Sequence, residues 1–146
     1  MSLEPALTVY FDGGCPLCSR EISFYQRCRG ADAIAWVDVA ATPDMPPDLA
    51  RAEALARFHV RRPDGTLVSG AAGFAALWRA LPGFALLGRL ASFPPVTALG
   101  ELAYRLFLPL RARLLARYRR SLAAGSDACA CGGDAVSPPP PAGPRP

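Results

Sequence analysis

Two cysteines, Cys15 and Cys18, lie with one proline and one leucine between them where an apolar stretch gives way to a helical pattern. Residues 6–11 are apolar, β-branched and aromatic, which predicts a strand, and the following glycines predict a turn. From Pro16 to Gly30, apolar residues recur every three to four positions, which predicts a helix. The sequence therefore places a Cys-x-x-Cys pair between a strand and the first turn of a helix.

This position favours ionisation of Cys15. The first turn of a helix has unpaired backbone N–H groups and lies at the positive end of the helix dipole. Both stabilise a thiolate, which is the nucleophile of disulfide exchange. Cys18 follows three residues later on the same face, close enough to close a disulfide. We therefore expect a redox dithiol in which a solvent-accessible Cys15 attacks and Cys18 resolves.

The composition is that of one compact globular domain, with 51% hydrophobic and 19% charged residues in 146. The sequence shows no export signal and no uncharged apolar stretch long enough for a membrane span. We therefore expect a cytoplasmic protein, where paired cysteines are more often catalytic or metal-binding than structural. Six arginines between Arg105 and Arg120 could contact nucleic acid or anionic lipid, but a solvated helix face is favoured and no nucleic-acid partner is expected.

The order of the remaining elements predicts the fold. Residues 33–39 form a second predicted strand, so the first two strands and their helix make a βαβ unit with parallel strands. Further elements are a short helix capped by Asp48 and ending near residue 56, a hairpin at 57–61 and 66–69 around Pro63-Asp64-Gly65, and a helix over 71–81. The fold class is therefore α/β, with a thioredoxin-like β-α-β-α-β-β-α core.

Additional helices are predicted after this core. One covers residues 84–93, Pro94-Pro95 forms a break, and a second covers 96–122 with a kink at Pro109. In the second helix an apolar stripe is predicted to pack on the thioredoxin-like body: Leu110, Leu114, Tyr118 and Leu122. Residues 1–122 are thus expected to form a thioredoxin-like domain with a C-terminal helical extension, and residues 123–146 a disordered tail rich in cysteine and proline.

The segment Asp12-Gly13-Gly14-Cys15-Pro16-Leu17-Cys18 resembles the signature of the DCC family of thiol-disulfide oxidoreductases, an Asp-x-x-Cys-x-x-Cys after a first strand. The Asp64-Gly65 hairpin, Leu81-Pro82-Gly83 and Tyr104-Arg105 resemble later segments of that family. The resemblance covers about residues 8–118. It implies a thioredoxin-like fold and disulfide reductase or oxidase activity. The expected partners are a disulfide-containing protein or low-molecular-weight thiol substrate and an external thiol reductant.

No cofactor is expected, because sulfur itself carries the two electrons. One feature departs from thioredoxin, which has a cis-proline facing the dithiol just before its third strand. Here the corresponding segment reads Leu55-Ala56-Arg57, without a proline.

Six neighbours of the two cysteines are candidate site residues: Asp12, Gly13, Gly14, Pro16, Leu17 and Arg20. Asp12 either exchanges the proton of Cys18 through water or forms an Asx-type turn with its own backbone. The two glycines are expected to supply unusual backbone angles and room for substrate. Pro16 stiffens the turn and Leu17 offers exposed apolar surface. Arg20 stabilises the thiolate, meets an acidic group of a partner, or is a solvated charge.

Two other functions remain open. A zinc-stabilised binding module would use Cys15, Cys18, Cys129 and Cys131 as ligands, although a redox pair is favoured over metal binding. A redox-inactive thioredoxin-like adaptor would bind a partner through its basic helices. If they bind no metal, Cys129 and Cys131 either accept the disulfide from Cys15 and Cys18 as a relay or are two idle thiols. His59 is expected to be a satisfied or half-buried histidine, and Cys28 a small buried apolar residue.

Overall fold

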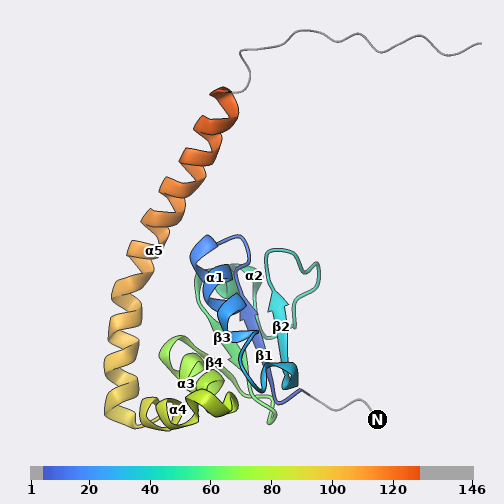
Figure 1. Ribbon diagram of the computed structural model, residues 1–146, viewed down its shortest axis with the longest axis vertical. Coiled ribbons are helices and arrows are strands. Elements are labelled where there is room, and N and C mark those ends of the chain that lie inside the picture. Colours follow the sequence, from blue (N-terminus) through green and yellow to red (C-terminus); the bar gives the residue numbers. More distant parts are fainter. Residues whose placement is uncertain (1–4, 129–146) are drawn as a thin grey trace, which may run out of the picture.

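The computed structural model describes residues 5–128 (Figure 1). Its elements are β1 (Leu7–Phe11), α1 (Pro16–Tyr25), β2 (Ile34–Asp38), α2 (Arg51–Ala56), β3 (His59–Arg61), β4 (Leu67–Ser69), α3 (Gly70–Ala80), α4 (Ala85–Ala91) and α5 (Pro94–Ala128), with short 3-10 turns at Ala31–Ala33 and Pro82–Phe84. This order confirms the predicted β-α-β-α-β-β-α core and the helices after it.

The four strands form one mixed sheet in the order β2-β1-β3-β4. The pair β1–β2 is parallel, as the βαβ pattern predicts, with Val9 opposite Trp36. The pairs β1–β3 and β3–β4 are antiparallel. The dithiol turn therefore follows the carboxyl end of a central strand, where open α/β sheets place their sites.

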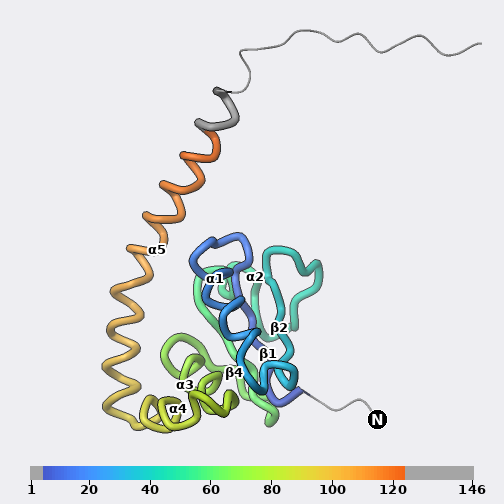
Figure 2. Tube along the Cα trace, viewed as in Figure 1, coloured from blue at the N-terminus to red at the C-terminus, as the bar shows by residue number. Residues whose placement is uncertain are grey.

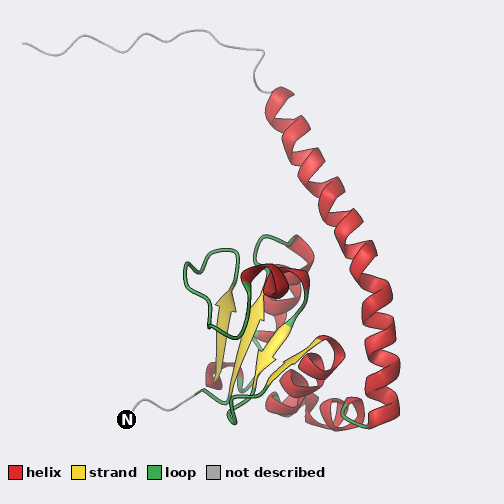
Figure 3. Ribbon diagram, turned by 180° about the vertical axis from the view of Figure 1, so that it is seen from behind, coloured by secondary structure: helices red, strands yellow, loops and turns green. Residues whose placement is uncertain are grey.

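Helices cover both faces of this sheet (Figure 3). Successive side chains of a strand point to opposite faces, so β1 contributes to two core clusters. On one face Val9 packs with Ile22 of α1 and Leu77 of α3. On the other, Tyr10 packs with Ala54 of α2. Both ends of the turn that holds the dithiol are thus anchored in core packing.

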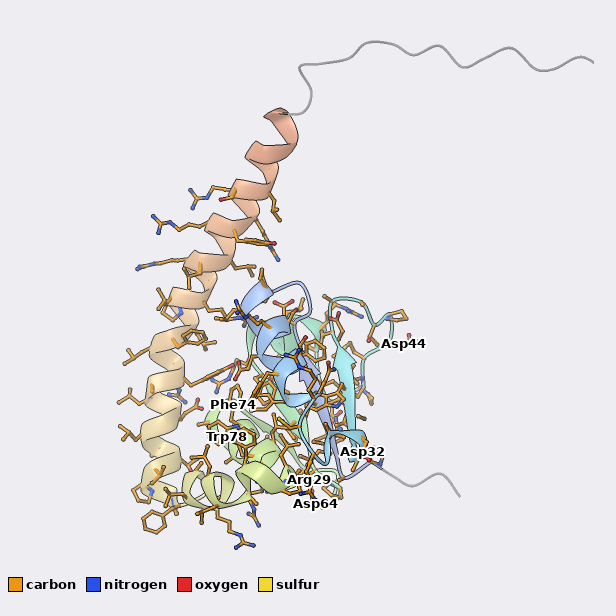
Figure 4. All side chains as sticks on the ribbon, in the orientation of Figure 1. Arg29, Asp32, Asp44, Asp64, Phe74 and Trp78 are labelled. Atoms are coloured by element: carbon orange, nitrogen blue, oxygen red, sulfur yellow. The ribbon has the colours of Figure 1, made fainter. Side chains whose placement is uncertain are left out.

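Aromatic side chains connect α3 to α1 and to α5. Trp78 of α3 donates a hydrogen bond of 3.0 Å from its Nε1 to the hydroxyl of Tyr25. Phe74, one turn earlier, makes an edge contact with Tyr104 of α5. Figure 4 shows Phe74 and Trp78 on the side of the body that faces α5.

The long helix α5 differs from its prediction in two ways. The break between α4 and α5 falls at Ser92 and Phe93, and Pro94 and Pro95 begin α5, where proline needs no hydrogen-bond donor. The helix also continues past residue 122 to Ala128, whereas Pro109 lies inside it as predicted. Figures 1 and 2 show its first part beside the body, a change of direction part-way, and a second part that extends beyond the body.

The predicted packing of the Leu110, Leu114, Tyr118 and Leu122 stripe is wrong, because all four side chains are exposed. A neighbouring row on the same helix faces the body instead, and its members are partly buried: Tyr104, Phe107, Arg111 and Leu115. Both rows have helical spacing, so only the position of the body relative to α5 decides between them.

Asp48 does not cap α2. Ala50 is the N-cap residue and no side chain caps this helix. Asp48 instead accepts two hydrogen bonds, of 2.7 and 2.8 Å, from the guanidinium of Arg61 in β3. A bidentate arginine–carboxylate pair stabilises the Asp48 carboxylate more than a single hydrogen bond from a backbone N–H would.

No single helix among residues 5–128 is long and apolar enough to cross a membrane. The segments Gly70–Ala80 and Pro82–Ala91 reach that length and hydropathy only as a pair, which is bent by 117°.

Candidate dithiol site

The turn between β1 and α1 holds Cys15 at the N-cap of α1. Its backbone is extended, with φ −95° and ψ 115°, and no side chain caps the helix. Pro16 takes the first helical position, and the Cys15 carbonyl accepts the first helical hydrogen bond, of 2.9 Å, from the Ser19 N–H. The Cys18 N–H, one of the free N–H groups of this first turn, is a hydrogen-bond partner of the Cys15 sulfur.

Cys15 is not the solvent-accessible thiol that the sequence predicts. Only 1% of Cys15 is exposed, whereas Cys18 is half-buried. The cover comes from α5: a groove of about 120 Å³ beside Cys15 is lined by Pro16 and Leu17 on one side and by Arg111, Leu114, Leu115 and Tyr118 on the other. This groove lies between α1 and α5, next to the sulfur.

Arg111 of α5 connects the three parts of the site. Its Nη2 donates a hydrogen bond of 2.9 Å to Oδ2 of Asp12, and both side chains are about nine-tenths buried. Its Nη1 reaches the carbonyls of Leu55 and Ala56, at 3.4 and 3.3 Å, in the segment before β3. The Nε of Arg111 is buried without an acceptor among residues 5–128.

The two thiols differ in acidity. Burial raises the pKa of Cys15, but the Cys18 backbone N–H, the Arg111 guanidinium and the Cys18 thiol outweigh it, so the net pKa lies below the ordinary 9.0. Burial, the shared hydrogen bond with Cys15 and the charge of Asp12 raise the pKa of Cys18 to about 12, although Arg111 opposes them. Cys15 is therefore the thiol of the pair that ionises more readily, and Cys18 is the one that keeps its proton.

Asp12 is buried and uses both carboxylate oxygens. Oδ1 accepts a hydrogen bond of 3.0 Å from the Gly14 N–H, which is the predicted Asx-type turn, and Oδ2 binds Arg111. Asp12 and Cys18 also line one cavity of about 40 Å³ between α1 and α5. That volume is enough for a water molecule.

The expectation that Gly13 and Gly14 supply unusual backbone angles is wrong, because neither has a positive φ. Gly13 is needed for space: a Cβ there would collide with the carboxylate of Asp38 at the end of β2. That carboxylate accepts hydrogen bonds of 2.9 Å from the N–H groups of Gly13 and Ala40. Ser19 Oγ donates to the Gly13 carbonyl at 2.8 Å, so the turn is held from both sides.

Leu17 and Arg20 differ in their relation to the site. Leu17 is 46% exposed and lines the groove beside Cys15, as expected of an apolar contact surface. Arg20 is exposed, lines neither the groove nor the cavity beside Cys18, and has no hydrogen bond or ion pair with the described part of the chain. It behaves as a solvated charge.

Two residues that sequence analysis left out complete the site, Arg111 and Asp38. Asp38 lies one residue before the end of the predicted strand 33–39 beside the dithiol strand, and the parallel pairing alone would have brought it to this edge. Arg111 had one local signal: it is an arginine within the row of Tyr104, Phe107 and Leu115 that faces the body.

The other cysteines and the histidine take simpler places. Cys28 is half-buried against the core, with its Sγ 3.5 Å from the Phe24 carbonyl. His59 is buried, and its Nδ1 lies 2.9 Å from the Arg57 carbonyl, so it is the satisfied histidine that was expected. Cys129 and Cys131 lie outside the described residues. Within residues 5–128, no three His, Cys, Asp or Glu side chains are grouped to hold a metal ion.

The sequence model of the DCC1-like thiol-disulfide oxidoreductase family matches residues 9–117. The chain belongs to this family. The matched range runs from β1 into the second half of α5 and so includes Asp12, both cysteines and Arg111. Membership supports a general thiol-disulfide oxidoreductase role for the arrangement described above.

Among curated proteins, an uncharacterized, chloroplastic protein of Arabidopsis thaliana is 25% identical over 115 residues. The alignment covers 76% of this chain and 53% of the relative, so the chain spans about half the length of that protein. No solved structure matches the sequence significantly.

Proposed function

We propose that this DCC1-like protein reduces disulfides through Cys15 and Cys18 by way of a mixed disulfide. The observation that carries the proposal is the difference in acidity between the two thiols. The pKa of Cys15 is lowered and that of Cys18 is raised to about 12, so Cys15 is the sulfur that more readily forms the nucleophilic thiolate while its neighbour keeps its proton.

In the first step the Cys15 thiolate attacks one sulfur of a substrate disulfide. A bond forms between Cys15 and that sulfur, the substrate S–S bond breaks, and the other substrate sulfur leaves as a thiolate that takes a proton from solvent. Arg111 remains beside Cys15 and loses the negative charge that it had stabilised. Its unpartnered Nε is then available to a carbonyl of the bound substrate.

In the second step Cys18 loses its proton and attacks the sulfur of Cys15. The Cys15–Cys18 disulfide forms, the mixed disulfide breaks, and the reduced substrate leaves as a thiol, so that the substrate gains two electrons and the protein loses two. Asp12 is the proposed acceptor of the Cys18 proton, through a water molecule in the cavity that both residues line. An external thiol reductant then restores the dithiol, and sulfur chemistry alone completes the cycle.

The groove beside Cys15 suggests the substrate. It is narrow and mostly apolar, formed by Pro16 and Leu17 of α1 and three apolar residues of α5. A disulfide on an extended, exposed protein segment, or a low-molecular-weight disulfide, can enter such a groove, whereas a disulfide in a rigid core cannot. Leu17 and the Arg111 Nε are the proposed apolar and polar contacts of the substrate.

Insulin reduction with dithiothreitol tests the proposal. The wild type is expected to accelerate the reaction, Cys15→Ser to abolish the acceleration, and Cys18→Ser to accumulate a mixed disulfide at Cys15. Cys28→Ser is the matched control, because it removes a thiol outside the site. Equal activity of the wild type and Cys15→Ser would favour the adaptor function.

The zinc-binding alternative uses Cys129 and Cys131, which lie outside the described residues, together with the dithiol. Elemental analysis distinguishes it: stoichiometric zinc that is lost in Cys15→Ser would contradict the redox proposal.

A further inference from the structure

One face of α5 carries four leucines followed by three arginines. We call this the outer row: Leu99, Leu102, Leu106, Leu110, Arg113, Arg117 and Arg120. Successive members are three or four residues apart, which aligns them along one side of the helix. The four leucines are 52 to 69% exposed, and the three arginines are exposed as well.

The outer row is turned away from the body. Contacts to the body come from the opposite side of α5, where the Tyr104 hydroxyl accepts a hydrogen bond of 2.9 Å from the Phe58 N–H and Arg111 binds Asp12. The preceding helix region adds exposed apolar side chains, with Leu86, Leu90 and Phe93 each at least 60% exposed. So many large exposed apolar groups in neighbouring helices indicate an interaction surface and not scattered surface residues.

The charge of this region limits what can cover it. Residues 85–123 contain seven arginines and one acidic residue, Glu101. Glu101 is already paired with Arg57 and Arg105. Figure 4 shows nitrogen-tipped side chains projecting from the second half of α5. A partner must therefore offer apolar surface and negative charge together.

A second copy of the chain does not satisfy this requirement. If two α5 helices paired in parallel through the outer row, the arginines of one copy would face those of the other, and like charges in contact repel. If they paired antiparallel, the arginines of each copy would face the leucines of the other, and charged groups would be desolvated without partners.

We infer that the outer row docks α5 on the surface of an anionic lipid bilayer. The leucine half would enter the boundary between headgroups and acyl chains, and the arginine half would lie against the lipid phosphates. Both requirements, apolar contact and negative charge, are met by that boundary. The groove beside Cys15 is lined from the opposite side of α5, so docking leaves it uncovered.

Vesicle flotation of the full chain tests this inference. We expect binding to vesicles of equal parts phosphatidylglycerol and phosphatidylcholine, weak binding to phosphatidylcholine alone, and loss of binding as salt is raised. Arg113→Gln/Arg117→Gln is expected to lower the partition roughly 25-fold, since each arginine near an anionic surface contributes about fivefold. Leu102→Gln/Leu106→Gln is expected to lower it to a similar extent.

Two controls separate this surface from general charge and from the redox chemistry. Arg27→Gln/Arg29→Gln removes the same charge from exposed positions outside α5 and is expected to bind like the wild type. Cys15→Ser is also expected to bind like the wild type, because docking does not use the dithiol.

Several outcomes would overturn the inference. These are absence of binding to either vesicle, equal binding to both vesicles, or an equal loss in the Arg27 and Arg29 control. Light scattering tests a fourth outcome. A dimer in solution that Leu102→Gln/Leu106→Gln dissociates would show that a second copy covers the outer row.

Discussion

Asp12 and Arg111 form a buried ion pair across 99 residues of sequence, with 2.9 Å between Oδ2 and Nη2. The pair joins the dithiol turn to a helix outside the thioredoxin-like core. The same guanidinium lowers the pKa of Cys15 and holds the segment before β3 by its carbonyls. In this chain α5 therefore takes part in the site and is more than an appended helix.

Replacing Arg111 should change the acidity of Cys15. In Arg111→Met, the pH midpoint for alkylation of Cys15 by iodoacetamide is expected to move upward, because the cation that favours the thiolate is gone. Arg111→Lys keeps the charge and should shift the midpoint less. Arg113→Met, an exposed arginine two residues further along, is the matched control and should leave it unchanged. An unchanged midpoint in Arg111→Met would show that the helix terminus alone activates Cys15.

The ion pair should also be visible in stability. Arg111→Met leaves the Asp12 carboxylate buried without its cation, which is expected to cost about 3 kcal/mol in the free energy of unfolding. Asp12→Asn/Arg111→Met should cost less than the sum of the two single changes, with a coupling of about 1–3 kcal/mol. Urea denaturation of the reduced proteins measures this cycle. Additive costs would mean that the two side chains do not interact.

The local parts of this fold could be predicted from the sequence. Apolar, β-branched and aromatic residues indicate β1. Asp64-Gly65 indicates the hairpin, where Gly65 has φ +82° and Asp64 Oδ1 accepts a hydrogen bond of 2.8 Å from the Thr66 N–H. The strand–turn–helix context of the two cysteines was likewise sufficient to place them at the N-terminus of α1. In each case the signal and the structure lie within a few residues of each other.

The long-range parts could not be predicted in this way. Burial of Cys15 depends on α5 lying across the turn, and nothing within a few residues of Cys15 encodes that cover. Two rows on α5 have helical spacing, and the row that faces the body includes an arginine, so hydrophobic periodicity favoured the wrong one. Arg111 is a site residue only because of tertiary contacts made from ninety-nine residues away.

The two thiols should titrate far apart. In a Cys28→Ala/Cys129→Ser/Cys131→Ser background, ultraviolet absorbance is expected to show one thiolate forming below the ordinary pKa of 9.0 and a second near pH 12. Cys15→Ser should remove the lower step, and should lower the pKa of Cys18 because the neighbouring sulfur raises it. Two steps near 9 would contradict the asymmetry on which the proposed mechanism depends.

Low pH should weaken the contacts through which Glu101 holds α5 to the body of the domain. Its carboxylate accepts hydrogen bonds from Arg57, Arg105 and the Ala71 N–H, and the Arg57 hydrogen bond is the main cause of a pKa below the ordinary 4.5. A carboxyl with a lowered folded-state pKa contributes stability above 4.5 and loses it as pH falls through the folded pKa. Glu101→Gln should therefore cost about 1–2 kcal/mol at neutral pH and progressively less in acid.

Unfolding curves at several pH values measure this effect. Glu53→Gln is the control, since Glu53 is mostly exposed and lies 3.7 Å from its nearest partner, His59. A cost for Glu101→Gln that stays constant into acid would show that the carboxylate charge does not hold α5.

The narrow groove beside Cys15 should make this thiol selective for small reagents. Cys15 is 1% exposed, and Leu115 of α5 forms part of the wall. Leu115→Ala removes several carbon atoms from that wall and is expected to raise the rate of reaction of Cys15 with a bulky polymer-linked maleimide at least several-fold. The rate with the small reagent methyl methanethiosulfonate should change by less than about twofold, because the thiolate itself keeps Arg111. Leu122→Ala, exposed on the same helix and outside the groove, is the control. Equal changes for both reagents would mean that α5 does not limit access, and that substrate reaches the sulfur by another path.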